Sequence, residues 1–259
     1  MKRFSLFASA VLVAGASFAA SVDVTDTLCL GVIPVTSSNS EVVISVPWVE
    51  VGASSTNCIS VTNFVLATGL TAGGLETGDK LIWYGGEASP KSWYLKTGSP
   101  LPFWKACTDG SVDAPNPDFP AIKQGQALIL TRHSPTNTDG TAKTFYLVGQ
   151  VGTNTTVRTT VAANGYTLVA PPAKQQINFN NTDHVAAVSG AYAKGDTIYV
   201  EVVNGIRRML KYDGEKWLPS WTPRTVENAT IDVGRGFWYY RKGDSSLTLE
   251  WKSGIVPHM

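Results

Sequence analysis

The amino-acid sequence predicts an all-β protein made of two tandem β-sandwich-like repeats after a cleaved signal peptide. Short β-branched and aromatic segments follow one another, with almost no helical periodicity. A set of short motifs also occurs twice in the same order. Asn204-Gly205 and Asp213-Gly214 are strong β-hairpin signals, because both central positions of a type I′ turn need a positive φ.

The N-terminal segment, residues 1–19, has the layout of a secretory signal peptide. Lys2 and Arg3 precede an apolar run that ends in small residues. We expect cleavage after Ala19, with Ala20 as the alternative, and export to the periplasm, the outer cell surface or the medium. No later apolar run is long enough for a transmembrane helix, so we expect no transmembrane segment.

Strands are predicted wherever short β-branched or aromatic runs are bounded by turn residues. A single helical turn is expected near Val61–Leu66. The predicted strands are Glu41–Val46, Lys80–Tyr84, Trp93–Leu95, Ala127–Leu130, Phe145–Val148, Tyr166–Val169, Thr197–Val203, Arg208–Tyr212, Gly236–Arg241 and Leu247–Trp251.

The repeat is visible in three pairs of motifs. Gly78-Asp79 corresponds to Gly195-Asp196, and Leu101-Pro102-Phe103-Trp104 corresponds at the same interval to Leu218-Pro219-Ser220-Trp221. In addition, an Ile-x-x-Gly motif precedes an arginine in each copy: Ile122–Gly125 precedes Arg132, and Ile231–Gly234 precedes Arg241. A polar Gly/Thr/Asn stretch places the boundary between residues 20–152 and residues 153–259.

The charge balance argues against nucleic-acid binding. The chain has 21 Lys and Arg against 20 Asp and Glu, a formal net charge of +1, and only 16% charged residues. Nucleic-acid binding needs a basic stripe that displaces counterions, and the sequence has none.

The three cysteines after the signal peptide all lie in the first repeat. In an exported protein one disulfide is expected, and we predict Cys29–Cys58 because these residues bracket the first hairpin region. Cys107 is then the remaining thiol.

The first repeat carries an insertion with four oxygen-bearing side chains, Asp109, Asp113, Asn116 and Asp118. Calcium prefers such hard oxygen ligands, so these residues form a candidate calcium site, the one cofactor considered. The spacing does not follow an EF-hand loop, and the alternative is a stiff polar surface loop. This insertion and the loop Ser134–Lys143 are the predicted recognition loops, because loops on a rigid β scaffold carry recognition.

Groups suited to catalysis are few. The only histidines are His133, His184 and His258, and none belongs to a known catalytic motif. His133 is read as a surface-loop residue rather than a general base. We therefore expect the protein not to be an enzyme.

Eight tryptophans are the other candidate for function. Indole and phenol faces can stack on sugar rings, whereas tryptophans at matching repeat positions are expected to fill the cores. In a strand, neighbouring side chains point to opposite faces, so one ring of each adjacent pair must point outward. The candidate sugar-binding residues are therefore Trp93, Tyr94, Trp238 and Tyr240.

The motifs Ile44-Ser45-Val46-Pro47-Trp48, Thr77-Gly78-Asp79, Tyr146-Leu147-Val148-Gly149-Gln150 and Gly234-Arg235-Gly236-Phe237-Trp238 follow this order along the chain. This layout resembles a group of uncharacterised, duplicated, secreted bacterial β-proteins with Ile-x-Val-Pro-(Phe/Trp) and Gly-x-Gly-(Phe/Tyr)-Trp modules. The first repeat has Gly125-Gln126-Ala127-Leu128-Ile129 where the second has the Phe-Trp pair. The resemblance implies export and a β fold.

The first functional hypothesis is an exported, non-enzymatic cell-surface or envelope protein with a structural or adhesive role, whose partners are surface or envelope proteins or glycans. The alternative is a carbohydrate-binding protein that uses exposed Trp and Tyr side chains. A carbohydrate-active hydrolase, which would need a pair of carboxylates, is the third interpretation.

Overall fold

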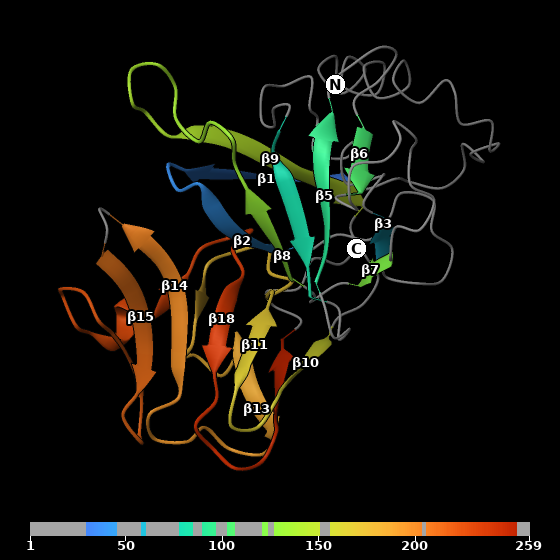
Figure 1. Cartoon of the computed structure of the whole chain (residues 1–259). Helices are drawn as coiled ribbons and strands as arrows, with labels where there is room; N and C mark the ends of the chain where they lie inside the picture. The colour runs from blue at the N-terminus through green and yellow to red at the C-terminus, as the bar shows by residue number, and fades with distance from the viewer. Residues whose placement is uncertain are drawn as a thin grey trace, which may run out of the picture.

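The structure is a computed structural model that describes residues 30–45, 58–60, 78–84, 90–96, 103–106, 121–123, 127–150, 156–203 and 206–252. Within these residues the protein is almost entirely β, with one 3-10 turn, η2 (Val226–Asn228), and this confirms the all-β prediction (Figure 1). The predicted signal peptide, the helical turn near Val61–Leu66 and the repeat boundary at residue 152 lie outside the described residues.

The first half contains a five-stranded antiparallel sheet of order β2-β8-β4-β5-β6, and two pairs, β1–β9 and β3–β7. Valine, isoleucine, leucine and aromatic residues at alternate positions favour these strands, because they pack well on a pleated surface. The strands are β1 (Leu30–Ser37), β2 (Glu41–Ser45), β3 (Cys58–Ser60), β4 (Lys80–Trp83), β5 (Lys91–Lys96), β6 (Phe103–Ala106), β7 (Ala121–Lys123), β8 (Ala127–Thr131) and β9 (Lys143–Gln150).

The second half contains a five-stranded sheet of order β11-β18-β14-β15-β16, a three-stranded sheet β10-β19-β13 and the pair β12–β17. Its strands are β10 (Val157–Val161), β11 (Tyr166–Val169), β12 (Ile177–Asn178), β13 (Val185–Ser189), β14 (Thr197–Val203), β15 (Ile206–Tyr212), β16 (Trp217–Pro219), β17 (Thr230–Ile231), β18 (Phe237–Tyr240) and β19 (Leu247–Trp251).

The two five-stranded sheets have the same order along the chain. In each sheet the first strand pairs with the last, the last pairs with the second, and the second continues through two antiparallel neighbours. The pairings Leu81↔Leu130 in the first sheet and Ile198↔Tyr239 in the second hold corresponding positions. Corresponding positions in the two halves can therefore be compared directly.

One core fills the space between the sheets of the second half. Ile198, Leu210 and Phe237 point inward from the five-stranded sheet, and Leu249 and Trp251 point inward from β19; each of the five is fully buried. Burial of such side chains stabilises a fold by about 1.5–3 kcal/mol each. The second half is therefore a β-sandwich around a continuous core.

Strand pairing changes the alignment of one motif. In the sequence, Trp104 corresponds to Trp221, whereas in the structure Trp104 lies opposite Leu95 and Trp217 lies opposite Tyr212, the residue that corresponds to Leu95. Trp217 is 1% exposed and belongs to the core. Trp217, not Trp221, is therefore the positional counterpart of Trp104.

The two halves meet where the end of β2 lies beside residues 234–236, just before β18 (Figure 1). The Ser45 N–H donates to the Gly234 carbonyl at 3.0 Å, and the Gly236 N–H donates to the Val43 carbonyl at 2.9 Å. The Arg235 guanidinium also donates to the carbonyl of Thr36 at 2.6 Å. Backbone hydrogen bonds thus cross directly from one half to the other.

Candidate functional site

A row of partly exposed aromatic side chains lies on the outer face of the five-stranded sheet of the second half. Tyr166 and Tyr240 are directly opposite on β11 and β18, with ring centroids 4.8 Å apart. Tyr199 on β14 lies 5.9 Å from Tyr166. Tyr166 is 59% exposed, so its ring is open to solvent. We call Tyr166, Tyr199, Trp238 and Tyr240 the aromatic face.

The aromatic face is continued by the first half. Trp238 lies opposite Tyr199 in the β14–β18 pair, and the ring of Tyr84 meets Trp238 edge-on at 5.6 Å. Tyr84 follows β4 of the first half and is 46% exposed. Edge-to-face pairs of this kind contribute about 0.5–1.5 kcal/mol beyond the area they bury. Both halves therefore contribute rings to one aromatic surface.

The four sequence-predicted sugar-binding residues are divided between two sheets. Trp238 and Tyr240 belong to the aromatic face and are half-buried. Tyr94 lies on β5 of the first sheet and is also half-buried. Trp93 is only 2% exposed, so the prediction that it is a ligand-binding residue is wrong. Trp93 lies opposite Leu81 on the inner face of the first sheet, and burial in that core excludes a ligand.

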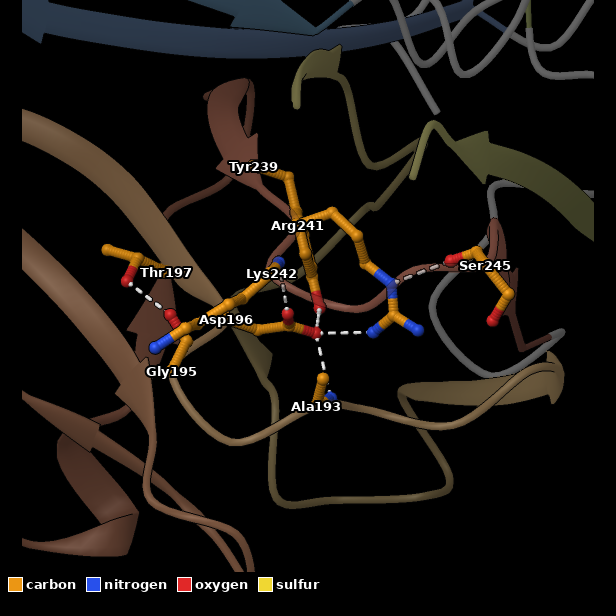
Figure 2. Close-up of polar contacts among 8 residues, drawn as sticks. All are labelled: Ala193, Gly195, Asp196, Thr197, Tyr239, Arg241, Lys242 and Ser245. Carbon is orange, nitrogen blue, oxygen red and sulfur yellow. Dashed lines mark hydrogen bonds and ion pairs between the residues drawn. The ribbon is translucent and has the colours of Figure 1, made fainter. Parts of the chain in front are cut away.

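A second cluster of polar groups is buried beside the aromatic face. The Asp196 carboxylate accepts hydrogen bonds from the Tyr239 hydroxyl at 2.7 Å, the Arg241 guanidinium at 2.6 Å, the Lys242 N–H at 2.8 Å and the Ala193 N–H at 3.0 Å (Figure 2). Asp196 has no exposed surface. A buried carboxylate is stable only when it is paired and hydrogen-bonded in this way.

The first half holds a corresponding pair. The Arg132 guanidinium lies 3.5 Å from the Asp79 carboxylate, and both side chains are buried. The His133 N–H donates to Asp79 at 2.8 Å, as the Lys242 N–H does to Asp196. This places His133 in the loop expected from the sequence.

In both halves the aspartate also binds the neighbouring strand through its backbone. The Leu95 N–H donates to the Asp79 carbonyl at 2.7 Å, and the Tyr212 N–H donates to the Asp196 carbonyl at 3.0 Å. The glycine before each aspartate has a positive φ, 96° at Gly78 and 93° at Gly195, which a side chain would disfavour. The repeated Gly-Asp motif thus starts the second strand of each sheet.

Burial changes the titration of two tyrosines near Asp196. Burial is the main reason why the pKa of Tyr239 is raised, and its hydrogen bond to the Asp196 carboxylate raises the pKa further. The pKa of Tyr192 is raised mainly by burial and also by the charges of Tyr212 and Asp196. Both hydroxyls therefore remain protonated in the folded protein well beyond the usual range.

The accessible chemistry is that of the aromatic face. The Asp196 carboxylate is fully engaged and buried, so it positions strands and contacts no ligand. On the aromatic face, the pKa of Tyr199 is raised, first by a side-chain hydrogen bond with Tyr166 and then by burial. Neutral phenols can exchange hydrogen bonds with the hydroxyl groups of a ligand.

Several predicted residues lie outside the described residues. They include the candidate calcium ligands Asp109, Asp113, Asn116 and Asp118, and Cys29 of the predicted disulfide; Cys58 starts β3, where only the backbone is described. Among the described residues, no group of three or more His, Cys, Asp or Glu side chains is placed to hold a metal ion. In the same part of the chain, no helix has the length and apolar character needed to cross a membrane.

The predicted recognition loop Ser134–Lys143 is an ordered turn with its own hydrogen bonds. The Asp139 carboxylate accepts the hydroxyl of Thr141 at 2.6 Å and its N–H at 2.9 Å, and these bonds lower the pKa of Asp139. The Asn137 N–H donates to the Thr141 carbonyl at 2.8 Å. The role of the Ser134–Lys143 loop in recognition stays a prediction.

Sequence reasoning missed two of the four residues of the aromatic face. Tyr166 and Tyr199 lie in predicted strands, but only strand order shows that β11 and β14 both flank β18. The hairpin connections along the chain do not reveal this order. The repeated Asp and Arg residues were visible as sequence motifs. Their recurrence at matching positions was the signal from which a buried Asp–Arg pair could have been predicted.

Comparisons with protein-family models, with curated proteins and with solved structures found no match for this chain.

Proposed function

We propose that this protein is exported to the cell surface or envelope and has a structural or adhesive role rather than an enzymatic one. The observation that carries this proposal is the direct joint between the halves. There, Ser45 and Gly236 donate backbone hydrogen bonds across the boundary, and the Ser45 hydroxyl donates to the Pro171 carbonyl at 2.5 Å. A joint of this kind resists rotation of one half against the other, as a protein that withstands mechanical force requires.

We also propose that the two halves are copies of one β unit. The shared strand order and the corresponding pairs Asp79–Arg132 and Asp196–Arg241 support this view. In both pairs the carboxylate holds the strand that ends just before the arginine against the strand that begins just after the aspartate. Buried charged side chains that hold strands together are consistent with a structural role.

Cell fractionation tests the export proposal. The protein expressed with its own N-terminus is expected in the periplasm, on the surface or in the medium, with a new N-terminus after Ala19. A deletion strain is expected to attach less well to surfaces or to show a weakened envelope. An uncleaved protein retained in the cytoplasm, or hydrolysis of a polysaccharide by the purified protein, would contradict the proposal.

The aromatic face favours carbohydrate binding as a second candidate function. Tyr166 is 59% exposed beside the half-buried Tyr240, and neighbouring aromatic rings on a sheet can stack on the apolar face of a sugar. A glycan array with the mature protein tests this idea. Tyr166→Ala should remove binding, whereas Val188→Ala, at a 43% exposed apolar residue on β13 of another sheet, should not.

A further inference from the structure

Strand alternation determines which charges share the aromatic face. Leu210 is fully buried in the core, so its neighbours on β15 at alternate positions, Arg207, Met209 and Lys211, point to the outer face. Met209 lies opposite Tyr199, and Lys211 lies opposite Thr197. Both Arg207 and Lys211 are exposed.

The acidic residue of this hairpin points to the other side. Glu201 lies opposite Arg208, and the Arg208 guanidinium is 3.4 Å from the Glu201 carboxylate. The same guanidinium lies 5.4 Å from the ring of Trp221, which packs against the core. The charges on the outward positions of the five strands are therefore the two cations Arg207 and Lys211.

Arg207 is held directly over an aromatic ring. Its guanidinium carbon lies 5.4 Å from the centroid of the Tyr199 ring, a cation–π contact that holds the charge over this ring. Guanidinium groups bind carboxylates through two parallel hydrogen bonds. Arg207 is therefore placed on the aromatic face to pair with a carboxylate of a ligand whose rings stack on Tyr166 or Tyr240.

From these observations we infer that the aromatic face binds an acidic polysaccharide, one whose pyranose rings carry carboxylates. The inference rests on the carbohydrate-binding candidate and specifies its ligand class. The aromatic rings take the apolar faces of the sugars, the linked hydroxyls of Tyr166 and Tyr199 meet the sugar hydroxyls, and Arg207 and Lys211 meet the carboxylates. A neutral glycan would leave both cations without a partner.

The test is a binding titration of the mature protein with polygalacturonate, alginate and hyaluronate, each compared with its carboxyl-reduced form. The acidic forms are expected to bind about tenfold more tightly, and added salt should weaken only them. Arg207→Gln and Lys211→Gln should each weaken binding of the acidic form about threefold. Lys174→Gln, which removes an exposed cation outside these strands, is the control and should have no effect.

The outcomes separate this inference from the candidate function on which it rests. Equal binding of acidic and reduced forms, with loss of about tenfold in Tyr166→Ala, would overturn the acidic specificity and leave carbohydrate binding in place. No binding of either form, here and on the glycan array, would overturn both. Circular dichroism and an unchanged unfolding midpoint establish that each variant is folded.

Discussion

The Asp79–Arg132 and Asp196–Arg241 pairs hold corresponding places in the two halves but differ in their surroundings. The nitrogen–oxygen distance is 3.5 Å in the first pair and 2.6 Å in the second. Tyr239 donates its hydroxyl to Asp196, whereas Leu130, at the corresponding position of β8, has no group to donate. Both halves therefore share the buried aspartate and arginine, and only the second half has a phenol at this strand position.

The outer faces differ more than the buried pairs do. The opposite residues Tyr166 and Tyr240 of the second half correspond to Glu41 and Thr131 of the first. Tyr199 of the second half likewise corresponds to Ile82 of the first. Inward positions must fill a core, and outward positions are free to change. The comparison teaches that the two halves differ mainly at positions on the outer face, and the buried Tyr239 is an inward exception.

The largest expected effect is that of removing the second buried carboxylate. Asp196→Ala leaves the Arg241 guanidinium buried without its anion, which should lower the free energy of unfolding by about 3–5 kcal/mol. Asp196→Asn keeps the shape and should cost less. Asp79→Ala, the corresponding change in the first half, should also destabilise strongly. Urea denaturation of the mature proteins measures all three, and a loss below about 1 kcal/mol in Asp196→Ala would contradict the structural role.

The hydroxyl that distinguishes the two pairs can be removed alone. Tyr239→Phe deletes one hydrogen bond to a buried charge and should cost about 1.5–3 kcal/mol. Tyr84→Phe, which deletes a hydroxyl from an exposed ring, is the matched control and should change stability little. If both variants unfold at the same denaturant concentration, the phenol adds nothing to the Asp196–Arg241 pair.

The joint between the halves depends on a close approach at Gly236. A Cβ on this residue would lie 2.7 Å from Val43 Cγ1 and 2.9 Å from the Val169 carbonyl, so Gly236→Ala should destabilise by about 1–3 kcal/mol. At Gly165 a Cβ would have only one contact, the Ala163 carbonyl at 3.5 Å, and Gly165→Ala is the control. Separate unfolding transitions in Gly236→Ala would show that the joint couples the halves, and an unchanged single transition at wild-type stability would contradict the contact.

Much of the fold could be predicted from local pattern, because alternation and turn residues act over a few positions. Tyr166–Val169, Thr197–Val203 and Leu247–Trp251 were predicted with the bounds that the structure shows. Other strands, such as β10 and β13, were not predicted. Val185–Ser189 contains small and polar residues and is held as a strand by pairing with β19, which is a long-range contact.

The candidate site could be predicted only in part, for the same physical reason. Trp238 and Tyr240 were identified from alternation within one strand, but the same reasoning selected Trp93, which is buried. Alternation predicts that two neighbouring rings face opposite sides of the sheet, but it does not predict which of them faces the core. That choice depends on the second sheet, and Tyr166 joins the site through strand order alone.

Alkaline pH should unfold the second half through its buried tyrosines. The pKa values of Tyr239 and Tyr192 are raised in the folded state by burial, so their contribution is complete below the unfolded pKa of about 10 and is lost as pH rises above it. Each tyrosine should lower the free energy of unfolding by about 1.4 kcal/mol per pH unit in that range. Tyr239→Phe should remove one of these two contributions. Stability that stays constant from neutral pH to beyond pH ~10 would contradict the burial of both hydroxyls.

The smallest expected effect concerns a hydroxyl that has no hydrogen-bond partner among the described residues. Tyr192 Oη is buried without a partner, and its ring packs 5.3 Å from Trp217 and 5.4 Å from Tyr212. Tyr192→Phe keeps these ring contacts and removes an unsatisfied polar atom, so stability should stay within about 0.5 kcal/mol of the wild type or rise. Tyr239→Phe, a chemically identical change at a bonded hydroxyl, should lose several times more, and thermal unfolding of the two variants compares them directly. A loss in Tyr192→Phe as large as that in Tyr239→Phe would mean that the Tyr192 hydroxyl is bonded in solution, and the distinction between the two tyrosines around Asp196 would then fail.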